Sequence, residues 1–264
     1  KYIEHDNELR FSEIPNLSAV KDKIPAGVYT YIYKQTKEGA TDSYLAKKDK
    51  FVLPAKLYGT VVERTERILA AYKALDKNMG VLLSGLAGAG KSLLIKYIAN
   101  KAVDELGMPV IIFTTDSVNK MSEFLDKTPQ PCVILLDEFE KMFDKVETQN
   151  YLLTLLDGVM DHKHLFLFTC NDINKINPYM LHRPSRIRYH FKFDRVPKEI
   201  AHEIIERDYI PVDNTNIAVL KLLTDMMEHL SYDMLFECVK ECNLYPAENP
   251  MDLVTELALK ISNI

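Results

Sequence analysis

GLAGAGKS occupies residues 85–92 and directly follows the apolar run 81–83. Its first and last glycines are five positions apart and are followed by Lys91 and Ser92, which is the pattern of a phosphate-binding loop. Small residues allow backbone N–H groups to turn inward around phosphate oxygens, and the next helix points its positive end at them. The sequence therefore predicts a nucleotide-binding site that follows a buried strand.

The chemistry of this loop assigns a role to each part of it. Lys91 is expected to reach the β- and γ-phosphates of a nucleotide, and the Ser92 hydroxyl is expected to ligate Mg²⁺. An apolar pattern of helical spacing follows and ends at Gly107, as a helix would. The residues assigned to the nucleotide are Gly85, Leu86, Ala87, Gly88, Ala89, Gly90, Lys91, Ser92 and Leu93.

Composition places the chain among globular proteins. It has 264 residues, 47% of them hydrophobic and 27% charged, with a net charge of −5. No apolar run approaches the roughly 20 residues that span a membrane, and the negative charge gives no support to nucleic-acid binding by bulk electrostatics. We expect a reducing, cytoplasmic location. The first residue is Lys1 rather than Met, which is compatible with a piece of a longer protein.

Cysteine and histidine positions favour packing over metal binding. Cys132 and Cys170 fall in strand-like runs and are predicted to be buried thiols. Cys238 and Cys242 are four residues apart on a predicted helix, but no second Cys or His pair stands nearby, so core packing is preferred to a metal site. The histidines at 162 and 164 are predicted to face solvent from a loop.

Three regions follow from the hydrophobic pattern. Residues 1–58 include the β-branched and aromatic run 28–33 and are predicted to form a small β-rich N-terminal element that binds a partner. Residues 59–197 are predicted to form an α/β core, with a capping box at Thr60 opening its first helix. Residues 198–264 are entirely helical in pattern, with Ser231 and Asn249 as predicted helix caps.

The core region is predicted to contain a five-stranded parallel sheet. Apolar runs that alternate with helical segments are typical of a parallel sheet covered on both faces. The predicted strands are residues 81–83, 110–113, 132–136, 165–168 and 187–193.

The run CVILLDE, residues 132–138, supplies a second motif. An apolar strand that ends in Asp137 places a carboxylate at the carboxyl edge of the sheet, where it can bind Mg²⁺. Glu138 is expected to orient and polarise the attacking water. The alternative is a buried strand that meets a solvated acidic turn, since Glu140 and Asp144 follow.

Together these motifs make the chain resemble the AAA+ ATPases of the remodelling or translocating branch, over roughly residues 59–245. Residues 80–92 resemble the first nucleotide motif of that family and residues 132–141 the second. Residues 149–159 (QNYLLTLLDGV) resemble its helix that ends in Leu-Asp-Gly. LFLFTCND and LHRPSRIR resemble the segments that carry its sensor 1 residue and its arginine fingers, at Asn171 and at Arg183 and Arg186.

The resemblance implies a Mg²⁺-dependent ATPase that assembles as a homo-oligomeric ring, with six subunits favoured. It further implies that the helical tail is a lid, that the arginines act on a neighbour's ATP, and that hydrolysis remodels or moves a protein partner. The chain departs from the family at Ser185, where Gly is usual, and no Arg stands near Ser231. The loop that grips polypeptide is also not evident, the nearest candidate being residues 120–122, which places linear threading of the partner in doubt.

Other functions stay open at this point. Arg183, Arg186 and four further basic residues between 188 and 198 form a basic cluster, so a DNA-acting relative such as a loader or replication factor is an alternative. A nucleotide-dependent scaffold that does not hydrolyse ATP is a second alternative, against which Glu138 and Asn171 argue. A small-molecule phosphotransferase ranks last.

Overall fold

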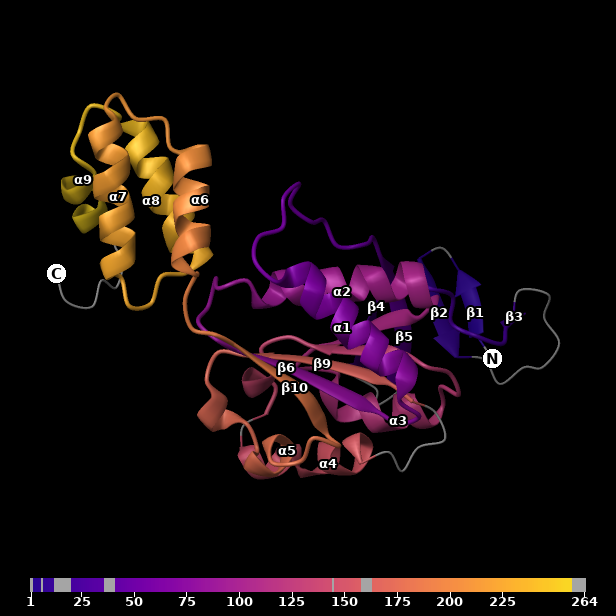
Figure 1. Cartoon of the computed structure of the whole chain (residues 1–264). Helices are drawn as coiled ribbons and strands as arrows, with labels where there is room; N and C mark the ends of the chain where they lie inside the picture. The colour runs from indigo at the N-terminus through magenta and orange to yellow at the C-terminus, as the bar shows by residue number, and fades with distance from the viewer. Residues whose placement is uncertain are drawn as a thin grey trace. The chain divides into compact units, whose positions relative to one another are not determined.

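The structure, a computed structural model, describes residues 2–5, 7–11, 20–35, 41–143, 145–157 and 163–257. Strands within these residues form one ten-stranded sheet in the order β10-β6-β9-β8-β7-β4-β5-β2-β1-β3 (Figure 1). The strands are β1 Tyr2–His5, β2 Glu8–Phe11, β3 Val20–Lys21, β4 Gly27–Gln35, β5 Thr41–Lys48, β6 Met79–Gly85, β7 Pro109–Phe113, β8 Val133–Leu136, β9 Leu165–Cys170 and β10 Ile187–Phe193. The α-helices are α1 Val61–Ala74, α2 Lys91–Leu106, α3 Met121–Asp126, α4 Asn150–Leu156, α5 Pro178–Leu181, α6 Lys198–Asp208, α7 Asn214–Met226, α8 Tyr232–Leu244 and α9 Pro250–Glu256.

The five strands predicted for the core are confirmed as β6 to β10. Parallel pairing joins β6 to β9, β9 to β8 and β8 to β7, with Val81 opposite Leu167 and Ile134 opposite Phe166. Every residue of β8 and β9 is buried, which explains why β8 is apolar throughout and β9 is apolar except at Thr169, rather than alternating. Because these strands are parallel, β6, β8 and β9 all end at the same edge of the sheet.

Helices cover both faces of this sheet, as the continuous apolar strands predicted. In the view of Figure 1, α1 and α2 lie above the core strands and α4 and α5 lie below them. One face packs Leu82, Ile134 and Phe166 into a cluster with Leu152 of α4 and Met180 of α5. The strands that carry the predicted site residues are therefore held in the middle of a three-layer core.

The N-terminal strands extend the same sheet. They pair with one another in antiparallel fashion, but β4 pairs in parallel with β7, so that Tyr29 lies opposite Ile111. Tyr31 packs on Phe113 and on Phe124, with ring centroids 5.1 and 5.3 Å apart. The β-rich element is thus observed, and it shares both a sheet and a hydrophobic core with the nucleotide-binding strands.

The chain divides into two compact units. One contains Lys1–Ser84 and Ser92–Phe191, and the other contains Gly85–Lys91 and Lys192–Ile264. The second unit holds the predicted lid as helices α6 to α9, in which Cys238 and Cys242 are buried. Neither the division at residue 58 nor that at residue 197 is tested by this arrangement, and both remain predictions.

Helix ends match the predicted caps in two cases of three. The Ser231 hydroxyl accepts the Met234 N–H at the start of α8, and the Asn249 side chain accepts the Met251 N–H at the start of α9. Helix α1 also begins at the predicted residue, but the Thr60 side chain makes no capping hydrogen bond. The capping box prediction was therefore right about position and wrong about the contact.

The prediction that His164 faces solvent was wrong. Its side chain is buried, and its Nδ1 accepts the Cys132 N–H at 3.3 Å, next to the start of β8. Residue 162 lies outside the described residues, as do residues 158 and 159 of the Leu-Asp-Gly segment.

Candidate active site

The phosphate-binding loop joins the end of β6 to the start of α2. Its three glycines, at 85, 88 and 90, all have positive φ angles. At Gly85, with φ +126°, an added Cβ would lie 2.2 Å from the Phe193 carbonyl oxygen, so no other residue fits. The glycine spacing that predicted the loop therefore reflects backbone conformations that side chains would obstruct.

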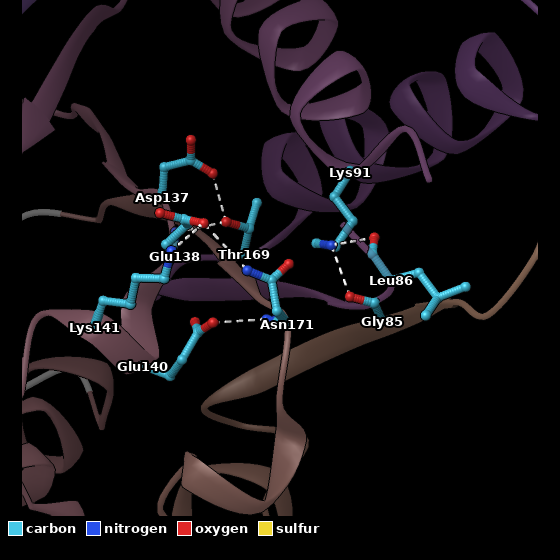
Figure 2. Close-up of polar contacts among 9 residues, drawn as sticks. All are labelled: Gly85, Leu86, Lys91, Asp137, Glu138, Glu140, Lys141, Thr169 and Asn171. Atoms are coloured by element: carbon cyan, nitrogen blue, oxygen red, sulfur yellow. Dashed lines mark hydrogen bonds and ion pairs between the residues drawn. The ribbon is translucent and has the colours of Figure 1, made fainter. Parts of the chain in front are cut away.

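Lys91 is turned back onto the loop that it follows. Its Nζ donates to the Gly85 carbonyl at 2.7 Å and to the Leu86 carbonyl at 2.6 Å, as Figure 2 shows. The side chain is buried, whereas Ser92, in the first turn of α2, is exposed. An ammonium group is thus held inside the loop by carbonyl oxygens, and a hydroxyl stands at the end of the helix where anions bind.

The loop also contacts the first turn of α8 within the second unit. The Tyr232 N–H donates to the Gly88 carbonyl at 3.1 Å. A Cβ built on Gly88 would lie 2.4 Å from Asp233 Oδ2. Only glycine suits position 88, because φ is +72° and because the Asp233 carboxylate leaves no room for a Cβ atom.

Two acidic residues follow β8, as the second motif predicted. Asp137 and Glu138 are both exposed, although every residue of the strand before them is buried. Asp137 Oδ1 accepts a hydrogen bond from the Thr169 hydroxyl. Carboxylate and hydroxyl oxygens are the ligands that Mg²⁺ takes from proteins, so Asp137 and Ser92 have the donor chemistry for that ion.

Glu138 receives two side-chain contacts on one carboxylate oxygen. Lys141 Nζ lies 2.7 Å from its Oε1, and Asn171 Nδ2 donates to the same atom at 3.2 Å (Figure 2). The ion pair raises the pKa of Lys141 above its ordinary value. The residue predicted to polarise water and the residue predicted as sensor 1 are therefore in direct contact.

Asn171 is placed by β9 and by Glu140. The residue directly follows β9, and its backbone N–H donates to Glu140 Oε1 at 2.9 Å. Glu140 is buried, with 8% of its surface exposed, and its Oε2 is buried without a hydrogen-bond partner. The alternative in which Glu140 belongs to a solvated turn is therefore not what the structure shows.

Two residues of this network, Thr169 and Glu140, were not predicted to belong to the site. Thr169 is the one polar residue in an otherwise apolar strand, and that interruption is a signal that could have identified it. Glu140 follows Asp137 and Glu138 in an acidic run, where charge alone does not distinguish a buried carboxylate from a solvated one.

The two residues predicted as arginine fingers differ in solvent exposure. Arg186 is 7% exposed, and its Nε and Nη2 each donate at 2.7 Å to Asp157, while its Nη1 donates to the Tyr179 carbonyl. The guanidinium lowers the pKa of Asp157. Arg183 is exposed on the turn that precedes β10. Only Arg183 is thus presented to solvent in this structure.

The described residues contain neither a cluster of metal-binding side chains nor a membrane-spanning helix. No group of three or more His, Cys, Asp or Glu side chains is placed there to hold a metal ion. None of the helices described is both long and apolar enough to cross a membrane.

Comparison with known proteins finds a family match for the central part of the chain. Residues 81–195 match the ATPase family associated with various cellular activities (AAA). These residues include the loop from Gly85 onward, both acidic residues after β8, Asn171 and both arginines.

Several curated proteins are distantly similar. The ribosome biogenesis ATPase RIX7 of Saccharomyces cerevisiae is 29% identical over 205 residues, which is 69% of this chain and 23% of that protein. An AAA ATPase forming ring-shaped complexes from Corynebacterium diphtheriae is 25% identical over 61% of this chain and 38% of its own length. The ATP-dependent zinc metalloprotease FtsH of Burkholderia pseudomallei is 27% identical over 49% of this chain and 22% of that protein. The matches thus span well under half of each of these relatives.

Proposed function

Since residues 81–195 form an AAA ATPase domain, we propose that this chain hydrolyses ATP with Mg²⁺ and uses the energy to remodel or move a protein partner. The observation that carries the proposal is the contact between Glu138 and Asn171, 3.2 Å apart at the edge of the sheet where β6 also ends. A carboxylate and an amide held together at this edge suit the task of orienting a water molecule.

Each predicted site residue has a role in this proposal. Lys91 and the loop N–H groups bind the phosphates, and Lys91 would exchange its carbonyl partners for phosphate oxygens. Ser92 and Asp137 would hold Mg²⁺, which neutralises developing charge on the phosphates when bound. Glu138 takes up the proton of the attacking water, and Asn171 fixes the position of the Glu138 carboxylate.

We further propose that the active form is a ring of identical subunits, with six favoured. Arg183 is the residue that would reach a neighbour's ATP, because its side chain is exposed while Arg186 is buried against Asp157. An arginine suits this task because its guanidinium stays charged and planar as phosphate charge redistributes. The name of the ring-forming Corynebacterium relative supports this part of the proposal.

A protein is the favoured substrate, and residues 1–58 are the proposed region for its recognition. The chain carries a net charge of −5, which disfavours nucleic acid. The similar proteins include a ribosome biogenesis ATPase and an ATP-dependent zinc metalloprotease. All four cysteines are free and buried, and we propose a reducing, cytoplasmic location for the chain.

The proposed function is tested with a variant that binds ATP but does not hydrolyse it. Glu138→Gln keeps the size of the side chain but cannot accept the proton, so phosphate release should fall about 10²–10⁴-fold while ATP stays bound. Glu66→Gln, which removes the same charge from an exposed position on α1, serves as the control. The trapped protein is then imaged for rings, and co-purifying proteins are identified by mass spectrometry. Wild-type protein that binds ATP without releasing phosphate would reject hydrolysis and favour the scaffold alternative.

A further inference from the structure

The hydroxyl of Thr169 lies between the two acidic residues that follow β8. Its oxygen accepts the Glu138 backbone N–H at 2.7 Å, and its proton is donated to Asp137 Oδ1. Figure 2 shows Thr169 beside both of these residues, with Asn171 close by. One side chain therefore contacts the backbone of the proposed water-polarising residue and the carboxylate of the proposed Mg²⁺ ligand.

The backbone of Glu138 needs such a contact. With φ +53° and ψ +49°, Glu138 adopts the left-handed conformation, and among the described residues it is the only non-glycine with positive φ. This conformation costs about 1–2 kcal/mol for a residue with a Cβ. If the Glu138 backbone changed to a negative φ, its carboxylate would point in a different direction. A contact that holds the backbone of Glu138 therefore also orients its side chain.

Thr169 is well suited to hold it. Its side chain is 1% exposed, and its strand β9 is paired on both sides, with Leu83 of β6 opposite Thr169 itself. Branching at Cβ also restricts the side chain to few rotamers. The hydroxyl is therefore fixed in space by the sheet, while Asp137 and Glu138 lie beyond the end of their strand on an exposed turn.

We propose that Thr169 is a positioning residue for ATP hydrolysis, which holds Glu138 in its left-handed conformation and orients the Asp137 carboxylate toward Mg²⁺. This inference rests on the proposed function. It adds a residue that contacts neither nucleotide nor water and acts through the two residues that do. Partners of this kind are typically worth about 10–100-fold in activity or metal affinity.

A buried threonine hydroxyl can also serve the fold alone, and a matched pair of variants separates the two roles. Thr169→Val removes the hydroxyl with little change in shape, and Thr169→Ser keeps it. Thr65→Val is the control, because Thr65 is equally buried and its hydroxyl donates to the Val61 carbonyl within α1, away from both acidic residues. Thr169→Ala removes the same hydroxyl without placing a methyl group against Asp137, and replaces the valine variant should that fail to fold.

The variants are compared by single-turnover hydrolysis, by ATP titration with and without Mg²⁺, and by thermal unfolding. We expect Thr169→Val to lower the hydrolysis rate about 10–100-fold and to weaken the enhancement of ATP binding by Mg²⁺, with Mg²⁺-free ATP affinity unchanged. Thr169→Ser should retain most of the rate, and Thr65→Val should change only the melting temperature.

The inference is overturned if Thr169→Val hydrolyses ATP as fast as Thr65→Val with the same Mg²⁺ dependence, or if Thr169→Ser loses as much as Thr169→Val. Failure of the proposed function has a different signature, because the wild type itself would then release no phosphate. In that case the role of Thr169 in hydrolysis falls with the proposed function, and the Mg²⁺ dependence of ATP binding tests only its contact with Asp137. An unchanged dependence in Thr169→Val rejects that part as well, and a weakened dependence supports the orientation of Asp137 alone.

Discussion

Arg186 and Asp157 form a bidentate ion pair, in which Nε and Nη2 of the guanidinium each lie 2.7 Å from one carboxylate oxygen. The Arg186 side chain is 8% exposed and that of Asp157 is 34% exposed, so the pair is partly screened by water. The contact ties the turn before β10 to the end of α4 within one subunit. It therefore gives Arg186 a structural task that exposed Arg183 does not have.

Arg186→Ala and Arg183→Ala should accordingly differ in stability. Removing Arg186 leaves Asp157 and the Tyr179 carbonyl without their donors, which should cost about 1–3 kcal/mol of unfolding free energy, toward the lower end because Asp157 is partly solvated. Removing Arg183 should leave stability within about 0.5 kcal/mol of wild type. Urea unfolding of each purified variant measures both values. Equal stability of the two variants would contradict the structural task assigned to Arg186.

The same pair sets a pH dependence of stability. Arg186 lowers the pKa of Asp157 in the folded protein. A lowered folded-state pKa means that the contribution is complete above the ordinary Asp pKa of about 4 and is lost as pH falls through the lowered value. Asp157→Asn should therefore be less stable than wild type at pH 7, and the difference should shrink in acid. A difference that stays constant from pH 7 to pH 2, measured by urea unfolding, would show that the charge of Asp157 is not responsible.

Gly88→Ala should impair ATP binding through Asp233. The added methyl group would lie 2.4 Å from Asp233 Oδ2, and the φ of +72° is strained for alanine. The double variant Gly88→Ala with Asp233→Ala replaces the clashing carboxylate by a methyl group. It should restore part of the affinity for ATP, because the clash is removed while the backbone strain at residue 88 remains. Fluorescent-nucleotide titration compares the three proteins, with Asp233→Ala alone as the control. Identical affinities for the single Gly88 variant and the double variant would exclude Asp233 as the cause.

Lys91→Ala should abolish ATP binding at some cost in stability. The ammonium group is the expected phosphate contact, and in this structure it also donates to the Gly85 and Leu86 carbonyls. These carbonyls become accessible to water in the variant, so we expect the loop to loosen without unfolding the core. Calorimetric titration with ATP and circular dichroism measure the two effects. Near-normal ATP affinity in a folded variant would reject the assignment of the loop.

Much of the fold was predictable because its signals are local. The run 132–136 is apolar throughout, as a strand buried on both faces must be, and it is β8. The run 28–33 is β-branched and aromatic, and it lies within β4. Its parallel pairing with β7 was not predictable, because the composition of a strand does not determine which strand it pairs with. That pairing has a consequence for the proposed recognition region, since removing residues 1–58 would uncover the edge of β7 and the Phe113 ring.

The site residues that were predicted belong to local sequence motifs, whereas the features that were missed depend on contacts between residues distant in sequence. Glycine spacing identified the loop, and an acidic pair after an apolar strand identified Asp137 and Glu138. The left-handed backbone of Glu138 and the hydroxyl that contacts it depend on a strand 31 residues away. Burial of Arg186 likewise depends on Asp157, 29 residues away. His164 was misassigned for the same reason, because its partner, the Cys132 N–H, is distant in sequence.

Mixed assemblies test whether Arg183 acts on a neighbour's ATP. Arg183→Ala should bind ATP normally and lose most hydrolysis, since an arginine finger is typically worth about 10³–10⁵ in rate. A Glu138→Gln subunit cannot hydrolyse its own ATP but presents an intact Arg183. An Arg183→Ala subunit keeps the water-activating site but presents no finger.

Each inactive protein therefore supplies what the other lacks, but only in one direction around a ring. Mixtures should regain activity at the sites where a Glu138→Gln subunit serves an Arg183→Ala neighbour, whereas a finger that acted within its own subunit would leave every mixture inactive. Exchange of subunits must be shown by fluorescence transfer between labelled proteins, and dilution of the wild type should lower its activity per subunit. A mixture that exchanges and stays inactive would show that Arg183 does not act in trans, because both halves of the site would then have been present without effect.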